Sequence, residues 1–335
     1  MAVGMAKTAL VFGISGQDGA YLASLLLAKG YRVIGASRDA EGSSFANLRE
    51  LGILEQISLR SACMNDFHAI LKVISETQPD EIYNLSGQSS VGLSFEQPLP
   101  TFESIVGGTL NILEAVRFLN ASIRFYNAAS GECFGNTQGV AASEQAPFRP
   151  RSPYAVAKAS AAMAVVNYRE AYGMFACSGF LFNHESPFRP HRFVTRKVVR
   201  AAARIARGED LRLMLGDISV RRDWGWAPEY VDAMWRMLNV DEPEDIVIAT
   251  GIHASLQEFV ETVFGFFDLD WRAHVDIDPG LRRPSDVAIS FGDPSRALQR
   301  LGWRASFTMP DVACAMAKAE AGSEPAAGGE VEKSL

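Results

Sequence analysis

Four residues near the middle of the chain have the types and the spacing to move protons on an alcohol. Ser130 and Glu132 lie two residues apart in "NAASGECFG", and Tyr154 and Lys158 lie four apart in "SPYAVAK". Residues four apart share one face of a helix, so the ammonium would sit beside the phenol. A tyrosine ionises at about pH 10, and a neighbouring cation lowers that pKa, which would make Tyr154 a general base for a hydroxyl held by Ser130. Such a trio needs no carboxylate, so Glu132 requires a separate explanation.

The elements that would position these residues are visible in the hydrophobic pattern. Apolar runs of strand length alternate with segments of helical spacing, a pattern that builds a parallel sheet with helices on both faces. Ser130 then ends a strand, and Tyr154 begins a helix over residues 154–172. The strand-like runs include TALVF, YRVIGAS, ISLRSACM, EIYNL, RFYNAAS and ACSGFLF, and the helical segments include AYLASLLLAKG, DFHAILKVISETQP and GGTLNILEAVRFLN. The pattern predicts a doubly wound α/β fold with right-handed crossovers.

A glycine-rich loop joins the first strand to the first helix. In "GISGQDG", Gly13, Gly16 and Gly19 are spaced three apart, which lets the backbone turn sharply and approach a pyrophosphate at the helix N-terminus. The spacing differs from the usual GxGxxG, and a tight turn is the alternative. The strand before it, the helix after it and a second strand about 20 residues on favour a dinucleotide site. In that context the Tyr154–Lys158 pair is better explained by catalysis than by an ordinary exposed helix face.

The predicted organisation is a doubly wound parallel-sheet Rossmann domain with a smaller, interleaved α/β substrate domain. The first domain covers residues 5–180, with a segment near 219–250 that returns to it. Residues 181–218 and 251–318 form the second domain, which closes over the carboxyl edge of the sheet. Residues 319–335 lack apolar periodicity, and we expect a disordered tail.

The end of the second predicted strand bears on the choice of cofactor. An acidic residue there would bind the ribose hydroxyls of NAD, whereas an arginine accommodates the 2′-phosphate of NADP. Ser37 and Arg38 come first and can both bind a phosphate, which favours NADP. The alternative is that Arg38 is solvated and Asp39 holds the ribose of NAD. With either cofactor, the nicotinamide cation and Lys158 would together stabilise the Tyr154 phenolate.

The bulk properties narrow the class of partner. A net charge of −7 and a pI near 5.4 argue against nucleic acid or an anionic membrane surface. No apolar run reaches bilayer-spanning length, and the first residues lack a signal-peptide pattern, so we expect a cytoplasmic protein. The cysteines have no metal-type spacing and are predicted to be reduced core thiols, with no metal site; they are Cys63, Cys133, Cys177 and Cys314.

Several longer motifs carry a family resemblance. The glycine loop, "SPYAVAK" and the strand-end serine resemble extended short-chain dehydrogenases/reductases that act on nucleotide sugars. "NLSGQSSVGLSFEQP", "NHESP", "FVTRK", "RRDWGWAPEYVDAMW" and "GDPSRALQRLGW" are similar to the GDP-mannose 4,6-dehydratase family over most of residues 8–305. The resemblance implies a hydro-lyase that converts GDP-mannose, or a close GDP-hexose, to the GDP-4-keto-6-deoxy sugar.

That activity gives Glu132 a purpose. Oxidation of carbon 4 acidifies the proton on carbon 5, and a carboxylate can remove this proton while the carbon 6 hydroxyl leaves as water. The family pattern has Thr-Ser-Glu where this chain has Ser130, Gly131 and Glu132, so a hydroxyl and the acid are both kept. A GDP-4-keto-6-deoxyhexose reductase or an epimerase would not need this second base. Glu132 could otherwise be a structural acid, and a silent nucleotide-sugar-binding protein is the remaining alternative.

The resemblance also implies a set of ligand-binding residues. A homodimer or homotetramer is expected, although Asp39 stands where the family has a second arginine in a loop that reaches a neighbouring subunit. Cys63, Phe188 and Trp226 also depart from the family pattern. The implied cofactor residues are Gly13, Gly16, Gln17, Asp18, Gly19, Ser37, Arg38, Met64, Leu85, Tyr154, Lys158 and His184. The implied substrate residues are Ser89, Asn183, Glu185, Ser186, Arg189, Val194, Lys197, Gly216, Arg222, Arg283 and Asp286.

Overall fold

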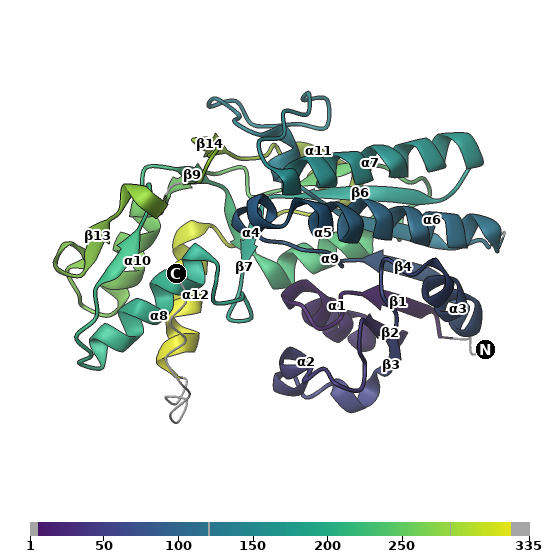
Figure 1. Ribbon diagram of the computed structural model, residues 1–335, viewed down its shortest axis with the longest axis horizontal. Helices are drawn as coiled ribbons and strands as arrows, with labels where there is room; N and C mark the ends of the chain where they lie inside the picture. The colour runs from purple at the N-terminus through teal and green to yellow at the C-terminus, as the bar shows by residue number, and fades with distance from the viewer. Residues whose placement is uncertain (1–5, 120, 282, 323–335) are drawn as a thin grey trace.

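The apolar runs of the sequence form one parallel sheet of seven strands. A computed structural model describes residues 6–119, 121–281 and 283–322 (Figure 1). The strands are β1 (Thr8–Phe12), β2 (Arg32–Ser37), β3 (Ser58–Ser61), β4 (Glu81–Asn84), β5 (Arg124–Ser130), β6 (Ala176–Leu181) and β11 (Ile246–Ile248). Their order, β11-β6-β5-β4-β1-β2-β3, reverses between β1 and β4 and confirms the predicted doubly wound fold.

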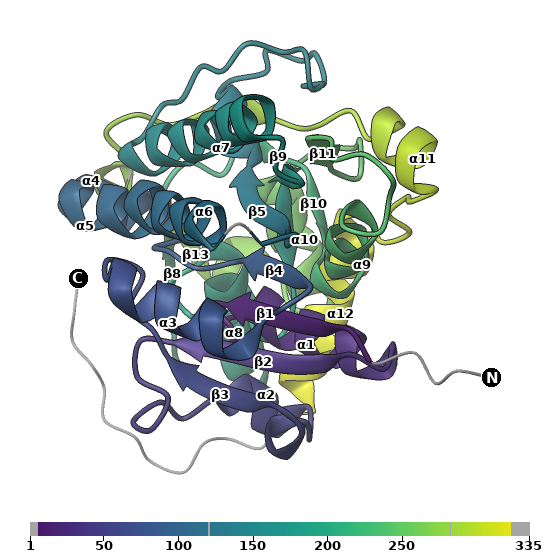
Figure 2. The same ribbon diagram turned by 90° about the vertical axis from the view of Figure 1, so that its right-hand side faces the viewer.

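Helices cover both faces of this sheet (Figure 2). Because side chains alternate along a strand, Ala9 and Val11 pack on one face, with α1 (Gln17–Ala28) and α9 (Ala227–Met237). Leu10 and Phe12 pack on the other, with α3 (Phe67–Thr77), α6 (Gly108–Phe118) and α7 (Pro153–Tyr172). Burial on both faces explains why β1 is continuously apolar in sequence. The shorter helices of this part are α2 (Ala46–Glu50), α4 (Val91–Glu96) and α5 (Pro98–Phe102).

A second, smaller hydrophobic core lies beyond the carboxyl ends of the strands. It is formed by α8 (Val194–Ala206), α10 (Leu256–Phe266) and α12 (Met309–Ala321), which lie together at one end of the molecule (Figure 1). Within the described residues, the remaining strands are short and form two pairs and one three-stranded group. The short strands are β7 (Asn183–Glu185), β8 (Leu213–Leu215), β9 (Arg221–Arg222), β10 (Trp224–Trp226), β12 (Ala254–Ser255), β13 (Val275–Ile277) and β14 (Ile289–Ser290). In the described part of the chain, no helix has the length and apolar content needed to cross a membrane.

Two parts of the predicted organisation differ from the structure. The tail was expected from residue 319, but α12 continues to Ala321, because the Glu320 carboxylate pairs with Arg196 at 2.7 Å. Residues 323–335 lie outside the described part of the chain. Helix α11 (Ser295–Leu301) falls in the range 251–318, yet it packs into the core of the sheet with Trp303. We keep the other domain boundaries as a proposal.

One buried carboxylate ties three loops together beside the carboxyl edge of the sheet. Asp223, between β9 and β10, is fully buried. One of its oxygens accepts hydrogen bonds from the Thr250 amide (3.0 Å) and hydroxyl (2.7 Å). The other accepts from the amides of Gly251 (3.0 Å) and Gly292 (3.4 Å). The carboxylate therefore fixes the backbone that presents the neighbouring Arg222.

Replacement of this carboxylate should destabilise the fold. Asp223→Ala leaves several buried donors unpaired, and each such donor costs about 1–3 kcal/mol. We expect the free energy of unfolding, measured by chemical denaturation, to fall by about 3 kcal/mol or more, with a smaller loss for Asp223→Asn. The exposed Asp241→Ala is the control and should stay within about 0.5 kcal/mol of the wild type. Equal stability of Asp223→Ala and this control would contradict the structural role.

Candidate active site

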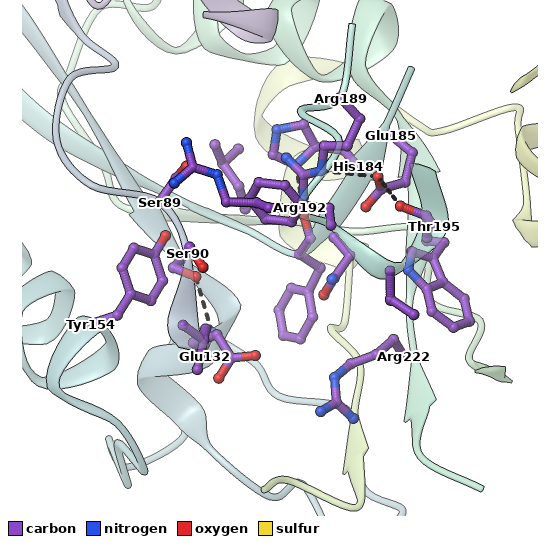
Figure 3. A pocket seen from close by; sticks show the side chains of 18 of the residues that line it. Ser89, Ser90, Glu132, Tyr154, His184, Glu185, Arg189, Arg192, Thr195 and Arg222 are labelled. Carbon is purple, nitrogen blue, oxygen red and sulfur yellow. Dashed lines mark hydrogen bonds and ion pairs between the residues drawn. The ribbon is translucent and has the colours of Figure 1, made fainter. Parts of the chain in front are cut away.

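A cavity of about 440 Å³ lies between the carboxyl edge of the sheet and the smaller core, a size typical of small-molecule sites. Its walls come from the residues after β4 and β5, from the first turns of α7, and from β7 and α8 (Figure 3). Parallel strands end at the same edge of a sheet, which is why segments far apart in sequence meet here. We describe the cavity from its cofactor side to its substrate side.

The glycine loop has the backbone shape that an anion cradle requires. Gly13 has a φ of +82°, and a Cβ there would lie 2.7 Å from the Leu85 carbonyl oxygen. A Cβ on Gly19 would lie 2.3 Å from the Gly13 carbonyl oxygen. Helix α1 begins after Gly16 without a side-chain cap, so its first amides remain available to a ligand. The loop therefore fits a dinucleotide pyrophosphate, and side chains at these glycines would not fit.

The first turn of α1 is bound to strand β7 by side chains. Gln17 donates to the His184 carbonyl oxygen at 3.2 Å and accepts from the Ser186 hydroxyl at 2.8 Å. The His184 ring lies with Nε2 2.9 Å from the Asp18 carboxylate and Nδ1 2.7 Å from the Phe182 carbonyl oxygen. Both ring nitrogens thus face acceptors, which a doubly protonated imidazolium satisfies.

This pairing shifts the pKa values of both Asp18 and His184. Burial alone would lower the pKa of His184, but the Asp18 carboxylate outweighs it and raises that pKa above its ordinary value. Burial would likewise raise the pKa of Asp18, but the charge and hydrogen bond of His184, with the Gln17 amide, lower it to about 2. The Asp18 carboxylate therefore favours the protonated form of His184 beside the glycine loop.

We expect the contribution of the Asp18–His184 pair to stability to depend on pH. Because the folded pKa of His184 is raised, its contribution to stability is full below the unfolded value of 6.5 and is lost as pH rises through the folded pKa. Because the pKa of Asp18 is lowered from 3.8 to about 2, its contribution is lost as pH falls through that range. The stability gap between wild type and Asp18→Asn should thus be larger at about pH 5 than at about pH 9.

Two measurements without added cofactor check this pair. Chemical denaturation at both pH values gives the gap, and an NMR titration of the His184 ring, assigned with His184→Gln, should show its pKa falling in Asp18→Asn. An unchanged His184 pKa in that variant would show that the carboxylate does not hold the proton.

The four predicted catalytic residues all line the cavity (Figure 3). Ser130 ends β5, and its hydroxyl accepts from the Glu132 amide at 3.2 Å in the short turn that follows. Tyr154 lies in the first turn of α7, which the Ser152 hydroxyl caps by accepting from Ala155 N at 3.1 Å. Lys158 Nζ donates to a strand β5 carbonyl at 2.6 Å and lies 5.9 Å from the centre of the Tyr154 ring.

In the chain alone, burial dominates the electrostatics of the phenol. Burial raises the pKa of Tyr154, and the hydrogen bond from Ser130 offsets only part of that rise. Burial also lowers the pKa of Lys158 to about 8. In the chain alone, proximity to Lys158 therefore does not suffice to ionise Tyr154, and the additional positive charge must come with a ligand.

Most of the predicted substrate residues also line the cavity. Ser186 is the exception, because it is fully buried and bonded to Gln17. Glu185 is buried and engaged within the wall, where its carboxylate accepts from Thr195 at 2.7 Å and pairs with Arg189 at 2.9 Å. The residues that line the cavity are Ser89, Asn183, Glu185, Arg189, Val194, Lys197, Gly216, Arg222, Arg283 and Asp286.

The other cofactor candidates divide between the cavity and its surroundings, with Ser37, Arg38 and Met64 outside it. Ser37 ends β2 and Arg38 follows it, with its side chain exposed. The Asp39 carboxylate accepts from the amides of Glu41 (3.0 Å) and Gly42 (2.8 Å) in its own loop. Met64 is buried in the core between the sheet and α3 and α6. Asp18, Leu85 and His184 line the cavity, together with Tyr154 and Lys158.

Two departures from the family pattern have packing roles. Phe188 stacks on Tyr21 of α1, with ring centres 4.9 Å apart, and Trp226 stacks on Phe307 at 5.5 Å. Neither lines the cavity.

Arg192, Phe193 and Thr195, which sequence reasoning did not select, do line the cavity. Thr195 stands inside the quoted "FVTRK" motif, whereas Arg192 lies in a loop whose spacing carries no signal.

Solved structures of low sequence identity have the same fold as this chain. A UDP-glucose 4-epimerase from Thermotoga maritima has a TM-score of 0.83 at 22% identity, covering 93% of this chain and 97% of its own. A dTDP-glucose 4,6-dehydratase from Bacillus anthracis, in complex with NAD, has 0.82 at 18% identity, covering 93% and 96%. RMD from Pseudomonas aeruginosa, complexed with NADPH, has 0.79 at 23%, covering 94% and 99%. The fold is that of extended short-chain dehydrogenases/reductases.

Sequence comparison then identifies the family. The family model described as GDP-mannose 4,6 dehydratase matches residues 10–316. GDP-mannose 4,6 dehydratase 1 of Arabidopsis thaliana is 44% identical over 308 residues, covering 89% of this chain and 85% of that protein. The GDP-mannose 4,6-dehydratase of Sinorhizobium fredii is 44% identical over 338 residues, covering 93% and 96%. The chain belongs to the GDP-mannose 4,6-dehydratase family, as its motifs predicted.

Proposed function

We propose that this protein is a hydro-lyase that converts GDP-mannose to the GDP-4-keto-6-deoxy sugar, with Ser130, Glu132, Tyr154 and Lys158 as its catalytic residues. The observation that carries the proposal is the meeting of two different proton acceptors, a phenol and a carboxylate, in one cavity beside a dinucleotide cradle. The family's relatives bear the name of this activity. A reductase or an epimerase would leave Glu132 without a role.

Each residue has a defined task in this reaction. A nicotinamide cofactor held at the glycine loop would supply reversible hydride storage between carbon 4 and carbon 6 of the hexose. Ser130 holds the carbon 4 hydroxyl, and Tyr154 removes its proton as the ketone forms. Glu132 then removes the acidified carbon 5 proton, which departs with the carbon 6 hydroxyl as water. Carbon 5 is finally reprotonated, so the sugar loses one water and the cofactor is unchanged overall.

Replacement of Glu132 tests this assignment directly. Glu132→Gln keeps the shape but cannot accept the carbon 5 proton, and loss of a positioned base typically costs about 10²–10⁴-fold in rate. The wild type should release a product lighter by one water, measured by mass spectrometry, without net accumulation of reduced cofactor. The variant should stop after oxidation of carbon 4, with no deuterium entering carbon 5 from heavy water.

Tyr154→Phe is the matched control, because it should block the first step as well. Product release by Glu132→Gln at the wild-type rate would make the carboxylate structural. A wild type that binds GDP-mannose without changing it would instead support the silent binder.

For the cofactor, we propose NADP. Among the described residues, the exposed Arg38 side chain has no hydrogen-bond or ion-pair partner, so it is available to a 2′-phosphate. Asp39 is engaged in its own loop by two amides, which disfavours its use on the ribose of NAD. Structures with this fold carry NAD or NADPH, so the comparisons support a nicotinamide cofactor of either kind.

The arginine distinguishes the two cofactors by charge. Arg38→Ala removes a charge-assisted pair worth about 1.5–3 kcal/mol, so NADP affinity should fall by about 10–100-fold while NAD affinity hardly changes. Calorimetric titration of both cofactors into both proteins measures the difference. Equal losses for NADP and NAD would show that Arg38 does not contact the 2′-phosphate.

The cellular setting completes the proposal. We propose a cytoplasmic homodimer or homotetramer whose partner is its GDP-sugar substrate. The acidic net charge of −7 supports the exclusion of nucleic acid and anionic membranes as partners.

A further inference from the structure

The basic side chains that line the cavity differ in how their charge is balanced. Most of them are engaged by a protein group: Lys158 donates to Ala128 O (2.6 Å), Lys197 to Met214 O (2.8 Å) and Arg222 to Val287 O (2.6 Å), while Arg189 pairs with Glu185 (2.9 Å) and Arg283 with Asp286 (4.0 Å). Arg192 is different. Within the described part of the chain, its guanidinium has neither a hydrogen-bond nor an ion-pair partner, although it lines the same cavity.

Arg192 belongs to the loop between β7 and α8, and this loop is well anchored. Its backbone turns through hydrogen bonds from Arg189 N to Ser186 O (3.1 Å) and from Phe193 N to Pro190 O (3.1 Å). The Arg189 guanidinium packs over the Phe193 ring at 4.1 Å. The residues on both sides of Arg192 are therefore fixed, while its own side chain is exposed and ready to bind a ligand.

The position of Arg192 in the cavity indicates which part of the substrate it can reach. Tyr154 marks the place where the hexose reacts, and Arg222, on strand β9, is held by Asp286 on another part of the wall. Figure 3 shows the Arg192 side chain on the side of Ser89 and Tyr154, away from Arg222. The hexose, and not the nucleotide, is the part that this side of the cavity would hold.

We infer that Arg192 is a specificity-determining residue that binds neighbouring hydroxyl oxygens of the hexose. A guanidinium presents several N–H donors in a planar fork, which matches two adjacent oxygen acceptors better than a lysine ammonium does. Bound sugar would give this group the partner that the protein does not provide. The inference rests on the proposed function, since it takes the cavity to hold a GDP-hexose.

The test separates the hexose from the diphosphate. Arg192→Ala should raise KM for GDP-mannose by about 10–100-fold, the range for a lost hydrogen bond to a charged group, and leave the affinity for GDP and for NADP unchanged. Arg192→Lys should lie in between, because it keeps the charge but not the fork. Arg304→Ala, an exposed arginine outside the cavity, is the matched control and should behave as the wild type.

The other outcomes overturn the inference. If GDP affinity falls as much as GDP-mannose affinity, Arg192 contacts the diphosphate; if only NADP affinity falls, it contacts the cofactor. No change in any of the three shows that the side chain is merely a surface charge. Calorimetric binding of GDP and GDP-mannose by Arg192→Ala can be compared with the wild type even where no product forms, so failure of the proposed activity remains distinguishable from failure of this inference.

Discussion

The ion pair between Asp18 and His184 joins the cofactor cradle to the substrate wall, and the rest of the site depends on it. Asp18 lies in the first turn of α1 and His184 in β7, which pairs in parallel with β10. The amides at the start of α1 must stay open for an anion. The side chains of this turn are therefore free to hold β7 and do not cap the helix. A displacement of α1 would move Asn183 and Glu185 with it.

Enclosure of the cavity has opposite effects on its catalytic groups. Burial excludes water and strengthens electrostatic interactions, but it also disfavours the charged forms of Tyr154 and Lys158. The phenolate thus needs positive charge that the chain does not supply alone. A site built in this way is a weak base when empty and becomes a stronger one only when its cationic ligand is in place. Proton transfer is then tied to the filled site.

The sequence predicts the elements well because burial on both faces makes parallel strands apolar and short. It also predicts that Ser130 and Tyr154 meet, because a strand end and the next helix start share the carboxyl edge of a sheet. It does not predict the contact that Ser186 makes. The motif placed this serine on the substrate path, but its hydroxyl donates to Gln17. The reason is that pairing between residues so far apart in sequence is decided by the packing of β7 on α1. Strand β11 is short, and it pairs with β6, which is far from it in sequence.

The distribution of positive charge over the site follows from the cost of burial. A buried guanidinium without a partner is strongly disfavoured, so Arg222 is held by Asp286 and a carbonyl oxygen even though it lines the cavity. The unpaired guanidinium groups of Arg38 and Arg192 can remain because water hydrates both of them. One stands at the end of β2 and the other at the hexose side. The cofactor would replace water at Arg38 and the hexose would replace it at Arg192, so these two exposed arginines can each discriminate between ligands.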